Sequence, residues 1–80
     1  MSDKATMIKT KILNEIEKEM KRLGMSQGEL GRRMGVERYN INRYLRSYKT
    51  PVSFDRIFEM AETVGLDINV TVKRKLKKKD

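Results

Sequence analysis

The first part of the chain carries apolar residues at intervals of three and four positions. Between residues 7 and 23 these residues are Ile8, Ile12, Leu13, Ile16, Met20 and Leu23. The spacing puts them on one face of a helix. Gly24 follows, and glycine commonly ends a helix because it adopts a left-handed backbone at little cost. The pattern predicts an amphipathic helix from about Met7 to Leu23.

A second, shorter helix is predicted to start near Ser26. Ser26 and Glu29 have the spacing of a capping box, in which the two side chains each bond to an unpaired amide of the first helical turn. Leu30 and Met34 are four residues apart, so we expect both to point inward. Gly35 then reverses the chain at a point where a side chain would be costly.

A third helix is predicted over about residues 37–46. Its apolar positions are Ile41, Tyr44 and Leu45. The positions left outside are Arg38, Tyr39, Asn40, Asn42, Arg43 and Arg46. Because so few residues point inward, most of this helix surface is open to solvent or to a partner.

A loop and a fourth helix come next. Pro51 has no amide to donate and pushes the preceding residue out of helical geometry. Ser53 is a suitable cap for the helix that follows. The apolar stripe of that helix consists of Phe54, Ile57, Phe58, Met60, Ala61 and Val64. Gly65 is expected to end it.

From Leu66 the apolar period changes to two. The residues Leu66, Ile68, Val70 and Val72 alternate with polar ones, and β-branched residues favour a strand. We therefore expect a mostly α fold in which residues 1–72 form one domain of four to five helices with one C-terminal β-strand. Residues 73–80, KRKLKKKD, are too polar to pack and are expected to form a basic, disordered tail.

The charge of the chain indicates an anionic partner. Nineteen Lys and Arg against eleven Asp and Glu give a formal net charge of +8 over 80 residues. Nucleic acid, a membrane surface and an acidic protein are the candidates. The basic excess lies in residues 25–50 and 73–80, whereas residues 51–72 carry one basic and four acidic groups. We expect the partner to meet the middle of the chain and its tail.

The composition also argues against several classes of protein. The chain has no cysteine and no histidine, which excludes a disulfide scaffold, a thiol nucleophile, a usual zinc site and an imidazole base. We expect no enzyme, no cofactor or metal and no small-molecule ligand. The first residues lack the apolar core of a signal peptide, and no stretch reaches the ~20 apolar residues of a membrane span. The expected location is cytoplasmic, without membrane contact.

The segment SQGELGRRMGV, the short helix after it and the following YKTP form a recognisable arrangement. Over roughly residues 8–66 it resembles the helix-turn-helix family of phage repressors and Cro, the XRE or lambda-repressor-like family. The matching positions are Ser26, Gln27, Glu29, Leu30, Gly35, Val36, Ile41 and Pro51. The departures are Gly31 for alanine, Glu37 for a serine or threonine cap, Leu45 for glutamate and Ser47 for glycine. At position 31 we expect both glycine and alanine to fit between the helices.

The resemblance implies that the partner is double-stranded DNA. It assigns base contacts to Arg38, Tyr39, Asn42 and Arg43, and phosphate contacts to Gln27, Arg46, Tyr48 and Lys49. The major groove admits one α-helix, whose side chains pair with the edges of the bases. Arginine binds guanine through two hydrogen bonds, and asparagine binds adenine in the same way.

The resemblance further implies a transcription regulator, a repressor that binds a palindromic operator as a homodimer. The predicted strand would form the dimer contact through Leu66, Ile68, Val70 and Val72, because a lone strand leaves its backbone unpaired. The alternative is an antitoxin, which neutralises a toxin protein by direct contact and represses its own operon. An enzyme, and a nucleoid protein without sequence preference, are two further alternatives that the sequence leaves open.

Overall fold

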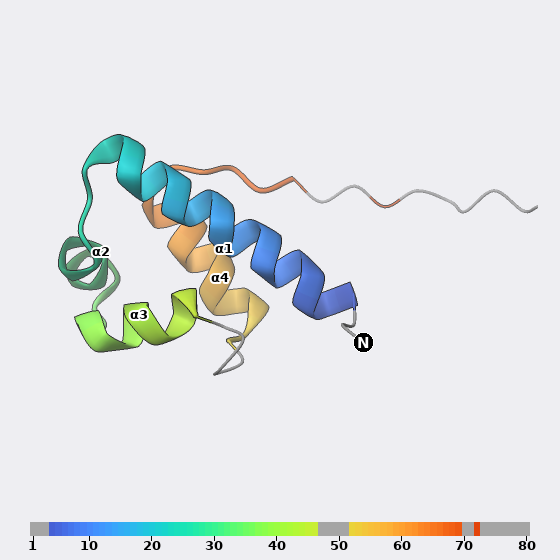
Figure 1. Ribbon diagram of the computed structural model, residues 1–80, viewed down its shortest axis with the longest axis horizontal. Helices are drawn as coiled ribbons and strands as arrows, with labels where there is room; N and C mark the ends of the chain where they lie inside the picture. The colour runs from blue at the N-terminus through green and yellow to red at the C-terminus, as the bar shows by residue number, and fades with distance from the viewer. Residues whose placement is uncertain (1–3, 47–51, 70–71, 73–80) are drawn as a thin grey trace, which may run out of the picture.

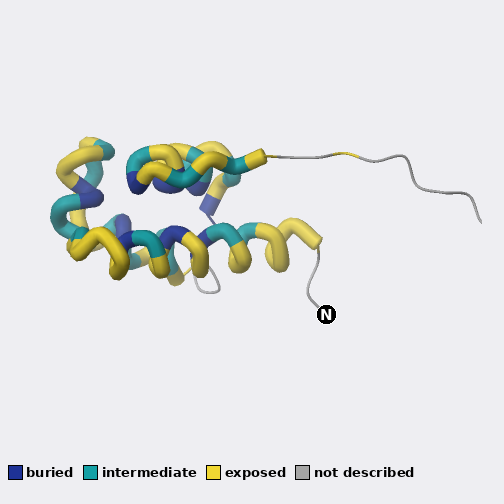
Figure 2. The backbone as a smooth tube through the Cα atoms, turned by 90° about the horizontal axis from the view of Figure 1, so that it is seen from above, coloured by how far each residue is buried: buried dark blue, intermediate teal, exposed yellow. Residues whose placement is uncertain are grey.

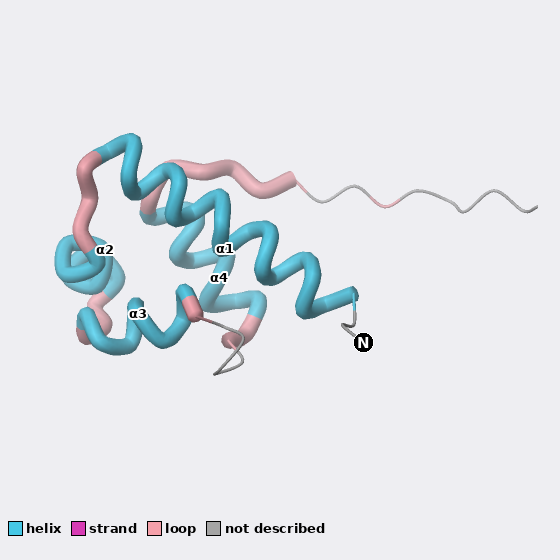
Figure 3. Tube along the Cα trace, viewed as in Figure 1, coloured by secondary structure: helices cyan, strands magenta, loops and turns pink. Residues whose placement is uncertain are grey.

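The computed structural model describes residues 4–46, 52–69 and 72, and the described chain forms a bundle of four helices (Figure 1). They are α1 (Lys4–Leu23), α2 (Gln27–Met34), α3 (Arg38–Leu45) and α4 (Phe54–Thr63). α1 and α4 lie along each other, and α2 and α3 gather at the end of the bundle remote from the N-terminus (Figures 1 and 3). The four helices predicted from the apolar spacing are confirmed, although α1 begins at Lys4 rather than Met7.

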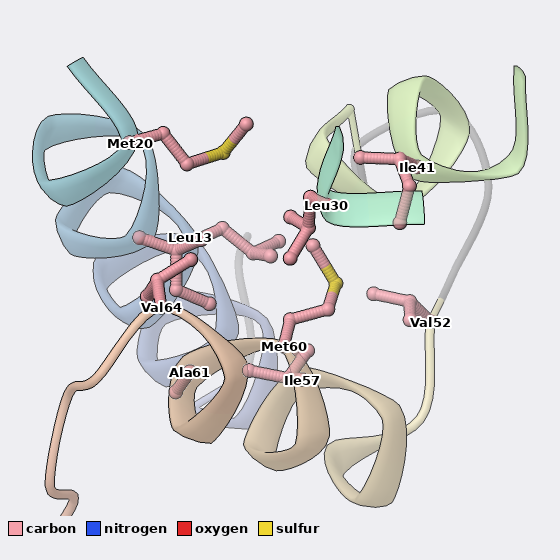
Figure 4. Close-up of a cluster of buried hydrophobic side chains, with 10 residues drawn as sticks. Leu13, Met20, Leu30, Ile41, Val52, Ile57, Met60, Ala61 and Val64 are labelled. Carbon is pink, nitrogen blue, oxygen red and sulfur yellow. The ribbon is translucent and has the colours of Figure 1, made fainter. Parts of the chain in front are cut away.

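One apolar core holds the four helices together. Its buried members are Leu13, Ile16, Met20, Leu30, Ile41, Val52, Ile57, Met60, Ala61 and Val64. Leu30 of α2, Ile41 of α3 and Met60 of α4 are each fully buried, and they lie in the same cluster in Figure 4. Buried residues follow the inner sides of the helices and exposed residues the outer sides (Figure 2). Val52, outside the predicted stripe, joins this core directly before α4.

The two ends of the predicted α1 stripe are not part of this core. Ile8 is 43% exposed and Leu23 is 45% exposed, although the predicted stripe places both on the apolar face of the helix. The reason is length, because α1 has 20 residues and the helix along it, α4, has 10. The middle of α1 is covered, and its ends extend beyond the neighbouring helices.

The opposite side of α1 is charged and paired. Lys18 lies 3.4 Å from the Glu15 carboxylate, and Arg22 donates hydrogen bonds to Glu19. The hydrogen bond from Arg22 lowers the pKa of the Glu19 carboxyl. These carboxylates therefore belong to a solvated, ion-paired helix face.

Within the described ranges, no helix is long and apolar enough to cross a membrane.

The C-terminal segment keeps the alternation that the sequence predicts. Leu66 and Ile68 are half-buried against the core, while Asp67 and Asn69 are exposed. No β-strand is formed among residues 66–69 and 72, because strand hydrogen bonds need a neighbouring strand. Val72 is 89% exposed, so the packed face does not continue to it.

α2 and the turn before α3 approach each other closely at Gly31. A Cβ atom at this position would lie 2.6 Å from the carbonyl oxygen of Val36, which is shorter than any normal contact. The expectation that alanine also fits here is therefore wrong. At Gly28, on the same helix, the nearest atom to such a Cβ is Arg38 Cδ at 3.6 Å, an ordinary van der Waals distance.

These two glycines of α2 allow a matched test of the close approach. Alanine normally stabilises a helix by about 1 kcal/mol relative to glycine, but overpacking costs about 1–3 kcal/mol. We expect Gly31→Ala to lower the free energy of unfolding by about 1 kcal/mol. Gly28→Ala should raise it by about 0.5–1 kcal/mol. Urea unfolding followed by circular dichroism measures both, and a Gly31→Ala protein as stable as the wild type would contradict the steric argument.

Candidate nucleic-acid interface

The surface of α3 divides into an anchored side and an outward side. Ile41 is fully buried and holds the helix to the core. Arg38, Tyr39 and Arg43 are exposed, and Asn42 is half-buried. Residues four apart on a helix lie above one another. Arg38 and Asn42 therefore form one row, and Tyr39 and Arg43 form a second row beside it. The four residues predicted to contact bases therefore share one continuous surface.

A side-chain hydrogen bond connects this surface to the start of α2. The Asn42 Nδ2 group donates to Gln27 Oε1 at 3.3 Å, across 15 positions of sequence. Gln27 is the first residue of α2 and is half-buried. The bond uses one of the two amide hydrogens of Asn42, so its second hydrogen and its Oδ1 atom remain for another partner. Gln27, which is predicted to contact phosphate, thus orients Asn42, which is predicted to contact a base.

The second row of α3 is also ordered by internal contacts. The Arg43 guanidinium lies over the Tyr39 ring, with 5.5 Å between Cζ and the ring centroid. Its Nη1 atom donates to Tyr39 Oη at 3.4 Å and to Asn40 Oδ1 at 3.2 Å. Arg43 therefore lies along the helix surface rather than extending into solvent.

The two helices of the motif begin in different ways. Ser26 caps α2, since its Oγ accepts a hydrogen bond from the Glu29 N–H at 3.0 Å. The Glu29 carboxylate pairs with Arg33 at 2.8 Å, so only the serine half of the predicted capping box is observed. Glu37 is the N-cap of α3 and makes no side-chain capping bond.

The turn between the helices depends on Gly35. Its φ of 74° lies in the left-handed region, and its N–H bonds to the Arg32 carbonyl at 3.4 Å. The Val36 N–H then bonds to the Gly31 carbonyl at 2.8 Å. These bonds satisfy carbonyl groups at the end of α2 and direct the chain into α3.

The predicted phosphate-contacting residues are only partly within the described chain. Gln27 begins α2, and Arg46, which is exposed, follows the last residue of α3. They flank the outward surface of α3 from the two ends of the motif. Tyr48 and Lys49 lie outside the described residues.

An open groove of about 710 Å³ adjoins this surface. Its lining includes Gln27 and Leu45 on one side and the charged side of α1 on the other. Three lysines of α1 take part, Lys11, Lys18 and Lys21. Sequence reasoning did not connect these lysines with the motif, since only the packing of α1 against the motif brings them beside Gln27. In the part of the chain that the structure describes, no group of acidic, histidine or cysteine side chains is arranged to hold a metal ion.

A protein-family comparison agrees with this geometry. The family model described as a helix-turn-helix domain matches residues 1–73. Comparisons with curated proteins and with solved structures gave no match. The match includes all four helices and the whole candidate interface on α2 and α3.

The uncapped start of α3 yields a test of the motif's stability. Glu37→Asp keeps the negative charge near the helix N-terminus and supplies a side chain short enough to accept from the Asn40 N–H, which now donates to the Glu37 carbonyl at 2.9 Å, as Ser26 accepts from the Glu29 N–H in α2. We expect the free energy of unfolding to rise by about 1 kcal/mol. Ser26→Ala, which removes an existing cap, should lower it by about 1 kcal/mol. Urea unfolding measures both changes. A Glu37→Asp protein less stable than the wild type would mean that the start of α3 is constrained by something other than its cap.

Proposed function

The chain belongs to the helix-turn-helix domain family, the domain of a DNA-binding regulator, and from this premise we propose that it is a sequence-specific repressor acting at a palindromic operator. The observation that carries the proposal is the outward surface of α3. It combines two arginines, an asparagine and a tyrosine on a helix anchored by the buried Ile41. A helix of this size enters the major groove, where each base pair offers a distinct pattern of donors and acceptors.

Each polar residue of that surface has a base that suits its chemistry. Arg38 and Arg43 would bind guanine, because a guanidinium donates two hydrogen bonds to O6 and N7. Asn42 would bind adenine through its Oδ1 and its second amide hydrogen, while Gln27 keeps the first. The hydrogen bond that Asn42 donates to Gln27 of α2 supports this role, since an oriented amide loses less freedom on binding.

Phosphate contacts would fix the position of α3 in the groove. Gln27, Arg46, Tyr48 and Lys49 are the proposed residues, at the start of α2 and after α3. Such contacts supply affinity that does not depend on sequence and that falls as salt rises.

A dimer would let two copies of α3 recognise a palindrome. Two recognition helices about 34 Å apart meet successive major grooves on one side of the DNA. The proposed contact is the segment Leu66, Ile68, Val70 and Val72, paired antiparallel with its counterpart in a second copy. Support comes from Leu66 and Ile68, which are packed on the core while the backbone of residues 66–69 has no strand beside it in the described chain. Val70 lies outside the described residues.

The second candidate function is that of an antitoxin. The same C-terminal segment would then pair with a toxin protein instead of a second copy of this chain. The observation that favours it is that no strand lies beside residues 67–69 in the described chain, where the last backbone bond before them is that of the Leu66 N–H to the Ala61 carbonyl. The mass of the purified protein separates the two, because a repressor that dimerises through this segment needs no second protein to cover it. A toxin gene beside this one would favour the antitoxin.

Selection of bound sites from random DNA tests the proposal directly. A palindromic consensus is expected, and the absence of any consensus would leave a nucleoid-type protein without sequence preference.

We expect Arg38→Ala and Asn42→Ala each to relax the preference at one position of the half-site, at a cost of about 1–3 kcal/mol. Unchanged affinity and preference in Arg38→Ala would mean that α3 does not contact the bases.

Arg46→Ala provides the matched control for phosphate contact. It should weaken binding to all sequences alike and reduce the slope of log K against log salt by about 0.9. Titrations of the selected site and of a scrambled site at several salt concentrations measure this. A change of base preference in Arg46→Ala would assign that residue to the bases instead.

The dimer contact has a separate test at position 70. Val70→Pro removes one backbone N–H from the proposed strand pair and adds no charge. Sedimentation should then give a monomer, whereas the control Val70→Thr, which keeps the N–H and the β-branch, should remain a dimer. A wild-type monomer at operator-binding concentration, or a dimeric Val70→Pro protein, would remove this segment from the interface.

A further inference from the structure

Tyr39 and Arg43 form a cation–π pair on the outward surface of α3. Tyr39 is 64% exposed, and the Arg43 guanidinium lies over its ring face at 5.5 Å. Both residues are clear of the core, and they are one helical turn apart. The pair therefore presents an aromatic ring and a guanidinium side by side to any partner of α3.

The hydrogen bonds of Arg43 leave one edge of the guanidinium available. Within the described residues both of its hydrogen bonds come from Nη1, one to Tyr39 Oη and one to Asn40 Oδ1. Nη1 has two hydrogens, so these contacts occupy it fully. The three remaining hydrogens lie on Nε and Nη2. That edge carries two parallel donors, which is what guanine O6 and N7 require.

We propose that Tyr39 and Arg43 act as one unit that recognises a guanine together with a neighbouring C5-methylated pyrimidine, either thymine or 5-methylcytosine. This inference rests on the proposed function, since it assigns the bases that α3 contacts. Arg43 supplies the hydrogen bonds to guanine, and Tyr39 supplies an apolar surface for the methyl group.

The position of Tyr39 relative to Arg43 selects the neighbouring base. A guanidinium that makes two bonds to guanine lies close to the plane of that base. The Tyr39 ring is one helical turn from Arg43, with its centroid 5.5 Å from Cζ, and is then displaced along the groove toward the next base pair. Successive base pairs are about 3.4 Å apart, so the ring meets the groove edge of the adjacent step. At that edge the C5-methyl group is the apolar feature of a pyrimidine.

The same contact would make binding sensitive to cytosine methylation. Thymine and 5-methylcytosine carry the methyl group at the same ring position, whereas uracil and cytosine carry hydrogen there. A guanine next to cytosine would therefore be bound more tightly after methylation of that cytosine. The unit thus responds to a chemical mark as well as to sequence.

Two matched pairs of duplexes test the inference. Both use the site selected by the wild-type protein, with the pyrimidine beside the guanine that Arg43 contacts varied alone. The first pair compares thymine with uracil, and the second compares 5-methylcytosine with cytosine. Within each pair the two duplexes differ only by the methyl group. We expect the methylated member of each pair to bind about fourfold more tightly, as for one buried methyl group. Equal binding within both pairs would overturn the proposal.

Variants of Tyr39 and Arg43 identify the residues responsible. Tyr39→Ala should remove the preference for the methyl group in both pairs, and Tyr39→Phe, which keeps the ring, should retain it. Arg43→Lys keeps the charge but lacks the planar fork, so it should lose the preference for guanine. Circular dichroism verifies that each variant is folded. Retention of the methyl preference by Tyr39→Ala would overturn the role of the ring.

The outcome of the selection separates this inference from the function on which it rests. If wild-type protein yields no consensus, the proposed function fails. If it yields a consensus without a guanine beside a pyrimidine, or one at which the methyl group has no effect, the proposed function stands and only this inference is overturned.

Discussion

The close contact between α2 and the turn before α3 determines the geometry of the interface. The Val36 N–H bonds to the Gly31 carbonyl, and the Val36 carbonyl occupies the space that a side chain at position 31 would need. Because these are backbone contacts, they allow little adjustment. They hold the start of α2 against α3, which is the condition for the hydrogen bond between Gln27 and Asn42. The orientation of the Asn42 amide, which is predicted to contact a base, thus depends on the absence of a side chain at position 31.

α3 buries few of its side chains, and this leaves its outward surface available for a partner. Ile41 is its only fully buried side chain, supported by the half-buried Tyr44 and Leu45. A buried aliphatic side chain contributes about 1.5–3 kcal/mol, so one such anchor is modest for a helix of eight residues. Its N-cap residue, Glu37, makes no side-chain capping bond. The helix is held by the turn before it and by the helices around it.

Side chains on the outward surface are ordered before any partner arrives. Asn42 is held by Gln27, and Arg43 is held by Tyr39 and Asn40. An arginine side chain carries about 2 kcal/mol of rotamer entropy, part of which these contacts have already removed. Binding then costs less, and the directions of the donors are set by the protein rather than by the DNA.

The sequence by itself determined the helices, because their signals are local. The apolar spacing, the Ser26 and Ser53 caps and the glycine after α2 act over a few residues, and all were observed. The tertiary structure alone decided which ends of α1 are exposed, that Gly31 has no room for alanine, and that Asn42 meets Gln27. These facts depend on helix lengths and on distances between residues remote in sequence, which residue spacing within one helix does not encode. The alternation of residues 66–69 was also visible in the sequence, but these residues form no strand, because strand hydrogen bonds need a neighbouring strand and none lies beside them in the described chain.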